Sequence, residues 1–212
     1  KVAQALKKFT LTADLELSEP ELLESLRAAD KHLKPVLACV NGSTAPVMNV
    51  FGQSHIDLAW LWPYEETKRK AARTFSTQLA LMDEYPEFRF LACEAFLLNI
   101  LKIHYPALFK RLKAKVKSGQ IFCDGAMWVE SDVNIPCGEA IIRQIVLGRK
   151  WFKENLGVDS KTVWLPDTFG FSGALPQIFA KCGVKYFSTQ KLLRCDPENE
   201  QFPYNNFWWK GI

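Results

Sequence analysis

Apolar runs of strand length alternate with amphipathic helical stretches from about residue 46 to the end of the chain. This alternation constrains the fold more than any other feature, because parallel neighbouring strands need a crossover connection, usually a helix, between them. In the predicted helix 65–82, for example, Phe75, Leu79 and Met82 recur on one face. The other predicted helices are 94–103, 106–117, 139–155 and 174–181, and the predicted strands are 46–51, 88–93, 120–124, 162–166 and 185–188.

Two α/β architectures fit this alternation: an open doubly wound parallel sheet and a barrel of strand–helix units. The Gly-x-Gly-x-x-Gly fingerprint of many nucleotide-binding open sheets is missing after the first predicted strand. Residues 1–45 differ from the rest, and a helix is predicted there from Ser18 to about Lys34, ended by Pro35. We therefore expect a helical lead-in, 1–45, and an α/β domain, 46–212, that ends in a strand-like aromatic run.

Composition narrows the class of protein. The chain of 212 residues carries 27 Lys and Arg against 23 Asp and Glu, a net charge of only +4, which does not favour nucleic-acid binding. No stretch approaches eighteen apolar residues, so no membrane association is expected. The six cysteines are scattered, with no Cys-x-x-Cys, as is common in a reducing compartment. Since no signal peptide is visible, we expect a cytoplasmic enzyme or binding domain.

The residues after the first predicted strand combine a histidine, a carboxylate and tryptophans. His55 and Asp57 are two positions apart, so both side chains face the same side of an extended chain. Such a pair makes half of a zinc site, although the same spacing also suits a histidine that only hydrogen-bonds to the aspartate. Trp60 follows closely, and a flat aromatic surface beside polar groups suits a sugar ring.

Two more strand ends carry carboxylates, at the place where parallel α/β folds hold their reactive residues. Asp167 follows the strand 162–166, and it lacks an obvious capping role because Ser172 is better placed to cap the next helix. Glu130 and Asp132 follow the strand 120–124. These two are either ligand contacts or solvated loop charges, and spacing alone does not decide between the alternatives.

Three sequence blocks then point to a known family. The blocks HIDLAWLWP at 55–63, MWVESD at 127–132 and WLPDTFGFSGALPQI at 164–178 resemble glycoside hydrolase family 38, the α-mannosidases, most closely its cytosolic, vacuolar and bacterial branch. The resemblance implies that the chain is the N-terminal part of a (β/α)7 catalytic barrel with parallel strands. It also implies a retaining, Zn²⁺-dependent enzyme in which His55, Asp57 and Asp167 bind the metal and Asp167 attacks the anomeric carbon.

The same resemblance implies contacts with a mannose-containing oligosaccharide from Trp60, Phe169, Lys191 and Asp132, and it is compatible with a homo-oligomer of the full-length enzyme. The family has a fourth zinc ligand, a histidine, and an acid/base aspartate well downstream of the nucleophile. Histidine is absent from residues 168–212. We therefore expect three zinc ligands, no acid/base residue and no turnover of α-mannosides by this chain alone.

Two other functions compete with this one. Another metal-dependent carbohydrate hydrolase, such as a deacetylase, would usually add a His-x(3–5)-His pair, whereas the next histidine after His55 is His104. A carbohydrate-binding module without enzymatic activity would use the tryptophans at the strand ends and would bind mannose without metal.

Overall fold

The computed structural model of the protein describes residues 1–38, 47–193 and 204–211. The chain divides into two compact units, Lys1–Asn49 and Val50–Ile212. The expected boundary between residues 45 and 46 falls outside the described residues and stays a prediction. Among the described helices, none combines the length and the apolar character needed to cross a lipid bilayer.

The first unit is a pair of packed helices, α1 (Val2–Thr12) and α2 (Glu19–Leu37). Ser18 is the N-cap of α2, in agreement with the predicted start, whereas α1 was not predicted. The predicted end at Pro35 is wrong, because α2 continues through Pro35 to Leu37. Proline has no backbone N–H to donate within the helix, but the last turn still forms, because the Ala38 N–H donates a hydrogen bond to the Lys34 carbonyl at 3.0 Å.

The described part of the second unit contains five short parallel strands in two sheets. Parallel pairing agrees with the sequence-based expectation, but the described strands do not close into a barrel, and a partial (β/α)7 barrel is not confirmed. Gly52 pairs with Phe90, and Phe90 with Ile121, while Thr162 pairs with Tyr186. The three-stranded sheet has the order β1 (Gly52–Gln53), β2 (Phe90–Leu91), β3 (Ile121–Phe122), and the two-stranded sheet contains β4 (Thr162–Trp164) and β5 (Tyr186–Ser188).

The predicted first strand is wrong. Pro46 lies outside the described residues, and 47–51 form no strand. Val47 and Met48 are 84% and 87% exposed. Pairing starts only at Gly52, whose N–H donates to the Arg89 carbonyl at 2.8 Å, so the apolar run precedes the sheet and has no strand opposite it. The aromatic residues near the C-terminus also form no strand over 204–211.

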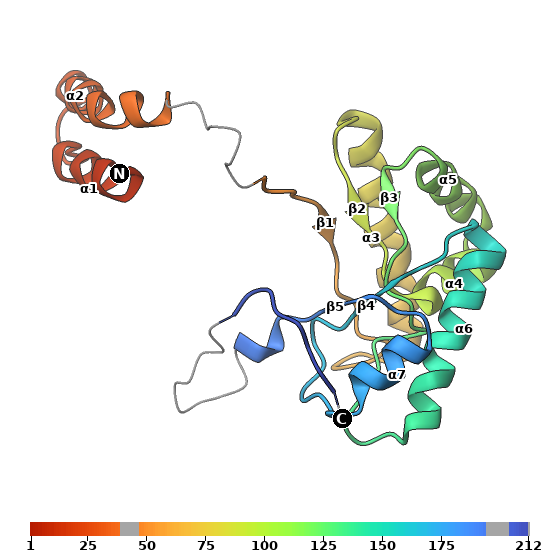
Figure 1. Ribbon diagram of the computed structural model, residues 1–212. Helices are drawn as coiled ribbons and strands as arrows, with labels where there is room; N and C mark the ends of the chain where they lie inside the picture. Colours follow the sequence, from red (N-terminus) through yellow and green to blue (C-terminus); the bar gives the residue numbers. More distant parts are fainter. Residues whose placement is uncertain (39–46, 194–203, 212) are drawn as a thin grey trace. The chain divides into compact units, whose positions relative to one another are not determined.

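The helices of this unit match the predicted ranges within two residues at each end. In α3 the buried side chains Ala71, Phe75 and Leu79 are four positions apart, as an amphipathic helix requires. Helix α6 ends at Gly157, whose φ of +73° is the left-handed conformation that glycine adopts readily. Figure 1 shows α4, α5 and α6 on one side of the strands. The helices are α3 (Tyr64–Glu84), α4 (Ala95–His104), α5 (Pro106–Lys117), α6 (Gly138–Leu156) and α7 (Leu175–Lys181), followed by the 3-10 turn Lys191–Leu193.

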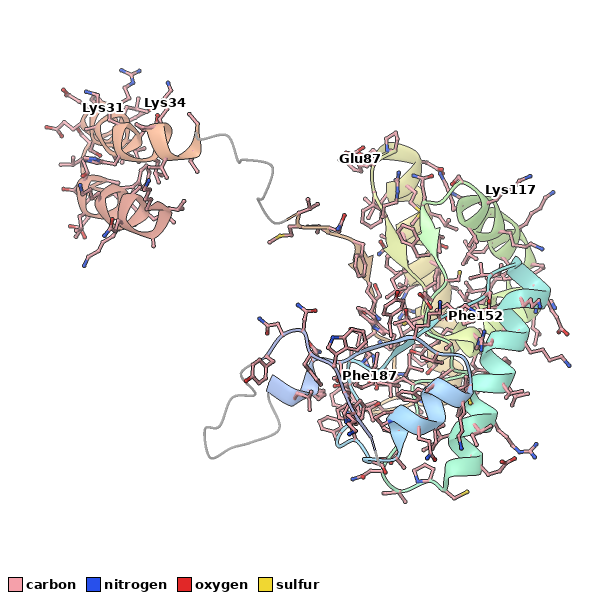
Figure 2. The ribbon with its side chains drawn as sticks, in the orientation of Figure 1. Lys31, Lys34, Glu87, Lys117, Phe152 and Phe187 are labelled. Atoms are coloured by element: carbon pink, nitrogen blue, oxygen red, sulfur yellow. The ribbon has the colours of Figure 1, made fainter. Side chains whose placement is uncertain are left out.

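Two apolar clusters hold the sheets against these helices. Fully buried Phe152 of α6 belongs to the cluster that packs β2 and β3 against α3, α4 and α5. Phe187 of β5 packs against the second cluster, which includes buried residues of β4, α6 and α7. Figure 2 labels both side chains, one in each cluster. Helix α6 contributes to both clusters and so joins the two sheets.

Asp124 connects β3 to β4, which do not pair as strands. Its carboxylate accepts hydrogen bonds from the Ser160 hydroxyl at 2.6 Å, the Lys161 N–H at 3.0 Å, and the Thr162 N–H and hydroxyl at 2.8 and 2.7 Å. Ser160 in turn accepts from the N–H groups of Gly125 and Ala126. This network takes the place of ladder hydrogen bonds and brings the end of β3 next to the start of β4.

Candidate active site

Each of the five parallel strands that the structure describes is followed by a polar side chain that belongs to one local cluster. Because the strands are parallel, their carboxyl ends can supply residues from distant parts of the chain to one site. Asp57 adds a second side chain from the first strand end. The residues that follow β1 to β5 are His55, Glu94, Glu130, Asp167 and Lys191.

His55, Asp57 and Asp167 form one compact group of possible metal ligands. His55 Nε2 lies 3.1 Å from Asp57 Oδ1 and 3.4 Å from Asp167 Oδ2. One donor atom from each of the three residues lies within 4.8 Å of the others. The two carboxylate side chains are about one third exposed, at 35% and 34%, so a cation or a substrate can reach them. The structure therefore brings together three residues that the sequence places up to more than a hundred positions apart.

The loop after β1 is held in place from helix α3. The Thr67 hydroxyl is buried and donates to the carbonyl of Leu58 at 2.6 Å, while Trp62 Nε1 donates to the same hydroxyl at 3.1 Å. Because this loop carries Asp57 and Trp60, the buried threonine orients both a possible metal ligand and an aromatic surface.

Two carboxyl groups behind His55 were not assigned to the site from the sequence. Glu130 Oε2 lies 3.0 Å from His55 Nδ1, and the backbone N–H of Glu130 hydrogen-bonds to the carboxyl group of Glu94. The sequence predicts Glu94 as the first residue of a helix, and it leaves Glu130 undecided between a ligand contact and a loop charge. The sequence signal that could have assigned both residues to the site is their position after an apolar strand, which they share with Asp167.

This arrangement shifts two pKa values upward. The hydrogen bond to Glu130 raises the pKa of His55 to about 9, against the opposing effect of burial. Burial raises the pKa of Glu94 to about 8, and the nearby charge of Glu130 acts in the same direction. When no metal is bound, buried Glu94 therefore favours its neutral form at neutral pH, and the neighbouring imidazole of His55 favours its charged form. His55, Glu94 and Glu130 make a second group of possible ligands within 4.8 Å.

Lys191 lies against the carboxylate of Asp167. Its ammonium group forms an ion pair with Asp167 Oδ1 and lies 4.5 Å from the centre of the Phe169 ring. Phe169 is 65% exposed. The predicted residues Asp167, Phe169 and Lys191 are therefore neighbours, although one of them belongs to a different strand end.

The remaining predicted contacts lie differently. Trp60 is 68% exposed and packs edge-on against Trp62, with ring centres 5.6 Å apart. Asp132 is exposed, and its Oδ1 accepts from the N–H groups of Asn134 and Ile135 at 2.8 Å each, which lowers its pKa. Those bonds fold its own loop, and a role of Asp132 in substrate binding stays a prediction.

Comparison with known proteins identifies the family. Residues 45–212 match the model of the glycosyl hydrolases family 38 N-terminal domain. The chain belongs to glycosyl hydrolase family 38. The resemblance carried by the three sequence blocks is thereby confirmed, and the reading as a deacetylase-like hydrolase of another family is set aside.

Relatives in family 38 are much longer than this chain. It is 45% identical over 161 residues to "Alpha-mannosidase G" of Dictyostelium discoideum, which covers 76% of this chain and 15% of that protein. It is 40% identical over 186 residues to "Alpha-mannosidase" of Saccharomyces cerevisiae, covering 86% and 17%. It is 38% identical over 204 residues to "Alpha-mannosidase 2C1" of Homo sapiens, covering 96% and 19%. The chain thus spans less than a fifth of each of these relatives.

A solved structure supports the fold. The crystal structure of an α-mannosidase from Enterococcus faecalis V583 superimposes with a TM-score of 0.60 at 24% identity, over 66% of this chain and 16% of that one. At this identity the likeness concerns the arrangement of helices and parallel strands.

Proposed function

We propose that this chain is the metal-holding, nucleophile-bearing part of a zinc-dependent retaining α-mannosidase that removes terminal α-D-mannosyl residues from oligosaccharides. Membership in family 38 supports the reaction class. The observation that carries the proposal is the convergence of His55, Asp57 and Asp167, whose donor atoms lie within 4.8 Å of one another. His55 and Asp57 follow β1 and Asp167 follows β4, and these are the three residues that the family resemblance implies as zinc ligands.

The donor set suits zinc. One imidazole nitrogen and two carboxylates are ligand types that Zn²⁺ commonly takes. The second ring nitrogen of His55 faces Glu130 at 3.0 Å, and metal-bound histidines usually hydrogen-bond through their other nitrogen in this way. Bound zinc would orient sugar hydroxyl groups and stabilise developing charge as a Lewis acid.

Asp167 is the proposed nucleophile. A retaining glycosidase uses one carboxylate to attack the anomeric carbon and a second carboxyl group as acid and base. Asp167 is about one third exposed, so its oxygens are accessible, while the ion pair with Lys191 restrains one of them. The backbone N–H of Asp167 donates a hydrogen bond to Glu130 Oε1, which restrains the position of Asp167 after β4.

Exposed aromatic rings supply the proposed sugar contacts. Trp60 follows Asp57 by three positions and Phe169 follows Asp167 by two, and the two flat rings are 68% and 65% exposed. Such rings stack on the apolar faces of sugars while charged groups bind the hydroxyls. We assign Lys191 and Asp132 to the hydroxyl contacts, on the family resemblance.

Zinc binding by the 212-residue chain tests the proposal. Titration of the metal-free protein with ZnCl₂ should give one bound ion, and His55→Ala or Asp57→Asn should weaken binding at least about 100-fold. His104→Ala is the matched control and should bind as the wild type does, since His104 lies at the end of α4, away from the strand ends. Equal zinc affinity in all four proteins would refute the metal site.

Catalysis is tested in a full-length enzyme that contains this segment. Asp167→Asn should abolish hydrolysis of an aryl α-mannoside while the fold and zinc content are retained, and unchanged turnover would remove Asp167 from its role. A metal-independent binding module would instead bind mannose in the presence of a chelator, so the same titration with chelator separates the two functions.

We also propose a cytoplasmic location. The four cysteines that the structure describes, Cys93, Cys123, Cys137 and Cys182, are unpaired, as a reducing compartment favours. Cell fractionation of the tagged protein tests this assignment, and recovery with secreted glycoproteins would contradict it.

A further inference from the structure

Glu130 touches both chain segments that supply the candidate metal ligands. Its Oε2 lies 3.0 Å from His55 Nδ1, and its Oε1 accepts from the backbone N–H of Asp167 and, at 3.3 Å, from the Thr168 hydroxyl. The side chain is only 9% exposed, so these protein groups, rather than bulk water, surround the carboxylate. A single, largely enclosed carboxylate therefore connects the end of β1 to the end of β4.

We propose that Glu130 is a positioning residue that orients the His55 ring and the Asp167 backbone for metal binding. The proposal rests on the zinc site proposed above. An imidazole binds a metal through one nitrogen only when that nitrogen carries no proton, and the partner of the other nitrogen decides which one is free. By accepting the Nδ1–H, Glu130 leaves Nε2 for the side that faces Asp57 and Asp167.

The carboxylate form of Glu130 is required for this role. Its two oxygens serve two sets of donors at once, since one oxygen faces His55 and the other faces Asp167 and Thr168. The amide of a glutamine has one acceptor and one donor. In Glu130→Gln an N–H₂ group must therefore face either the His55 ring or the Asp167 N–H, so one of the two segments loses its acceptor.

Asp124 offers a matched control. It lies in the same connection between β3 and α6 and is also a carboxylate, but it binds the start of β4 rather than its end. Its hydrogen bonds go to Ser160, Lys161 and Thr162, so Asp124→Asn perturbs the scaffold without touching His55. A purely structural role of Glu130 would make the two variants behave alike.

The experiment measures zinc affinity and the His55 ring proton in the same proteins. ZnCl₂ is titrated in competition with a coloured chelator, and the exchange of the His55 Nδ1–H with water is followed by NMR in the metal-free chain. His32 and His104 serve as internal references, because the chain has three histidines. In Glu130→Gln we expect about 10- to 100-fold weaker zinc binding and about tenfold faster exchange of the Nδ1–H. Asp124→Asn should change neither quantity by more than about twofold.

The outcomes separate this proposal from the proposed function. Unchanged zinc affinity in Glu130→Gln would overturn the positioning role, because either orientation of the amide removes one of the two acceptors. Weaker zinc binding with unchanged Nδ1–H exchange would assign the loss to the Asp167 N–H, and weaker binding with faster exchange would assign it to His55. If the wild-type chain binds no zinc, the proposed metal site fails, and the ring proton alone decides whether Glu130 orients His55. If Glu130→Gln does not fold, Glu130→Asp replaces it, because it keeps the charge but withdraws both oxygens by one methylene, and zinc binding should weaken in the same direction.

Discussion

Gly125→Ala tests how closely the ends of β2 and β3 must approach to build the site. A Cβ at residue 125 would lie 1.8 Å from the carbonyl oxygen of Cys93 and 2.6 Å from its carbonyl carbon. The carbonyl would have to retreat by about 1.2 Å to reach even 3.0 Å, a separation that real Cβ atoms rarely fall below. The opposing atoms belong to backbone, which cannot rotate away as a side chain can.

The carbonyl of Cys93 is part of the peptide bond to Glu94, so its retreat would displace Glu94 from its present position beside Glu130. Overpacking a well-packed interior costs about 1–3 kcal/mol, and a clash with backbone belongs at the upper end. We expect Gly125→Ala to lower the free energy of unfolding by about 3 kcal/mol.

Urea unfolding followed by tryptophan fluorescence measures this loss, because all seven tryptophans lie in the second unit. Gly173→Ala is the matched control, since no atom lies within 4 Å of its ideal Cβ position, and its stability should stay within about 0.5 kcal/mol of the wild type. A loss below about 1 kcal/mol in Gly125→Ala would refute the requirement for close approach.

Three further changes test other parts of the structure. The pKa of Glu94 is about 8 in the folded chain and ordinarily 4.5, so the unfolded chain releases this proton at lower pH than the folded chain does. The free energy of unfolding of the metal-free chain should therefore fall by up to about 5 kcal/mol as pH rises from 4.5 to 8. Urea midpoints across this pH range should fall less in Glu94→Gln than in the wild type. In the variant the contribution of His55, which also decreases as pH rises from 6.5 to 9, remains. Parallel pH profiles of the two proteins would contradict the assignment to Glu94. Asp124→Asn should lower the free energy of unfolding, measured in urea, by about 2 kcal/mol, because one amide oxygen cannot replace two carboxylate oxygens that accept four hydrogen bonds. An unchanged free energy of unfolding would refute the role of Asp124 in joining β3 to β4. Trp60→Ala should raise KM for an aryl α-mannoside about tenfold in a full-length enzyme while the urea midpoint stays constant, and an unchanged KM would exclude stacking by this ring.

Local patterns predicted the helices of the second unit well, because the determinants of these helices are local. The four-residue spacing in α3 and the glycine after α6 each depend on neighbours within one or two turns. The strands were predicted less well. The run 46–51 has the composition of a buried strand, yet a strand exists only where a partner lies opposite, and that partner begins at Phe90.

The candidate site was predicted in part. His55 and Asp57 could be singled out by their two-residue spacing and Asp167 by the lack of an obvious capping role, and the family resemblance then implied that the three bind one ion. Glu94 was not singled out and Glu130 was left undecided, because a carboxylate at a strand end is equally suited to a cap, a solvated loop or a buried contact. Asp124, in the same loop as Glu130, serves the scaffold, which its sequence context does not reveal.

The amino-acid sequence by itself determined the succession of strands and helices, the family, and the strand ends at which reactive groups stand, since these follow from periodicity and from short motifs. Only the tertiary structure decided which of those groups meet. Glu130 bridges His55 and Asp167, and Glu94 lies buried behind it, because parallel pairing and the close approach at Gly125 bring together segments that are remote in the chain. Burial and charge proximity, which raise the pKa values of His55 and Glu94, exist only after that assembly.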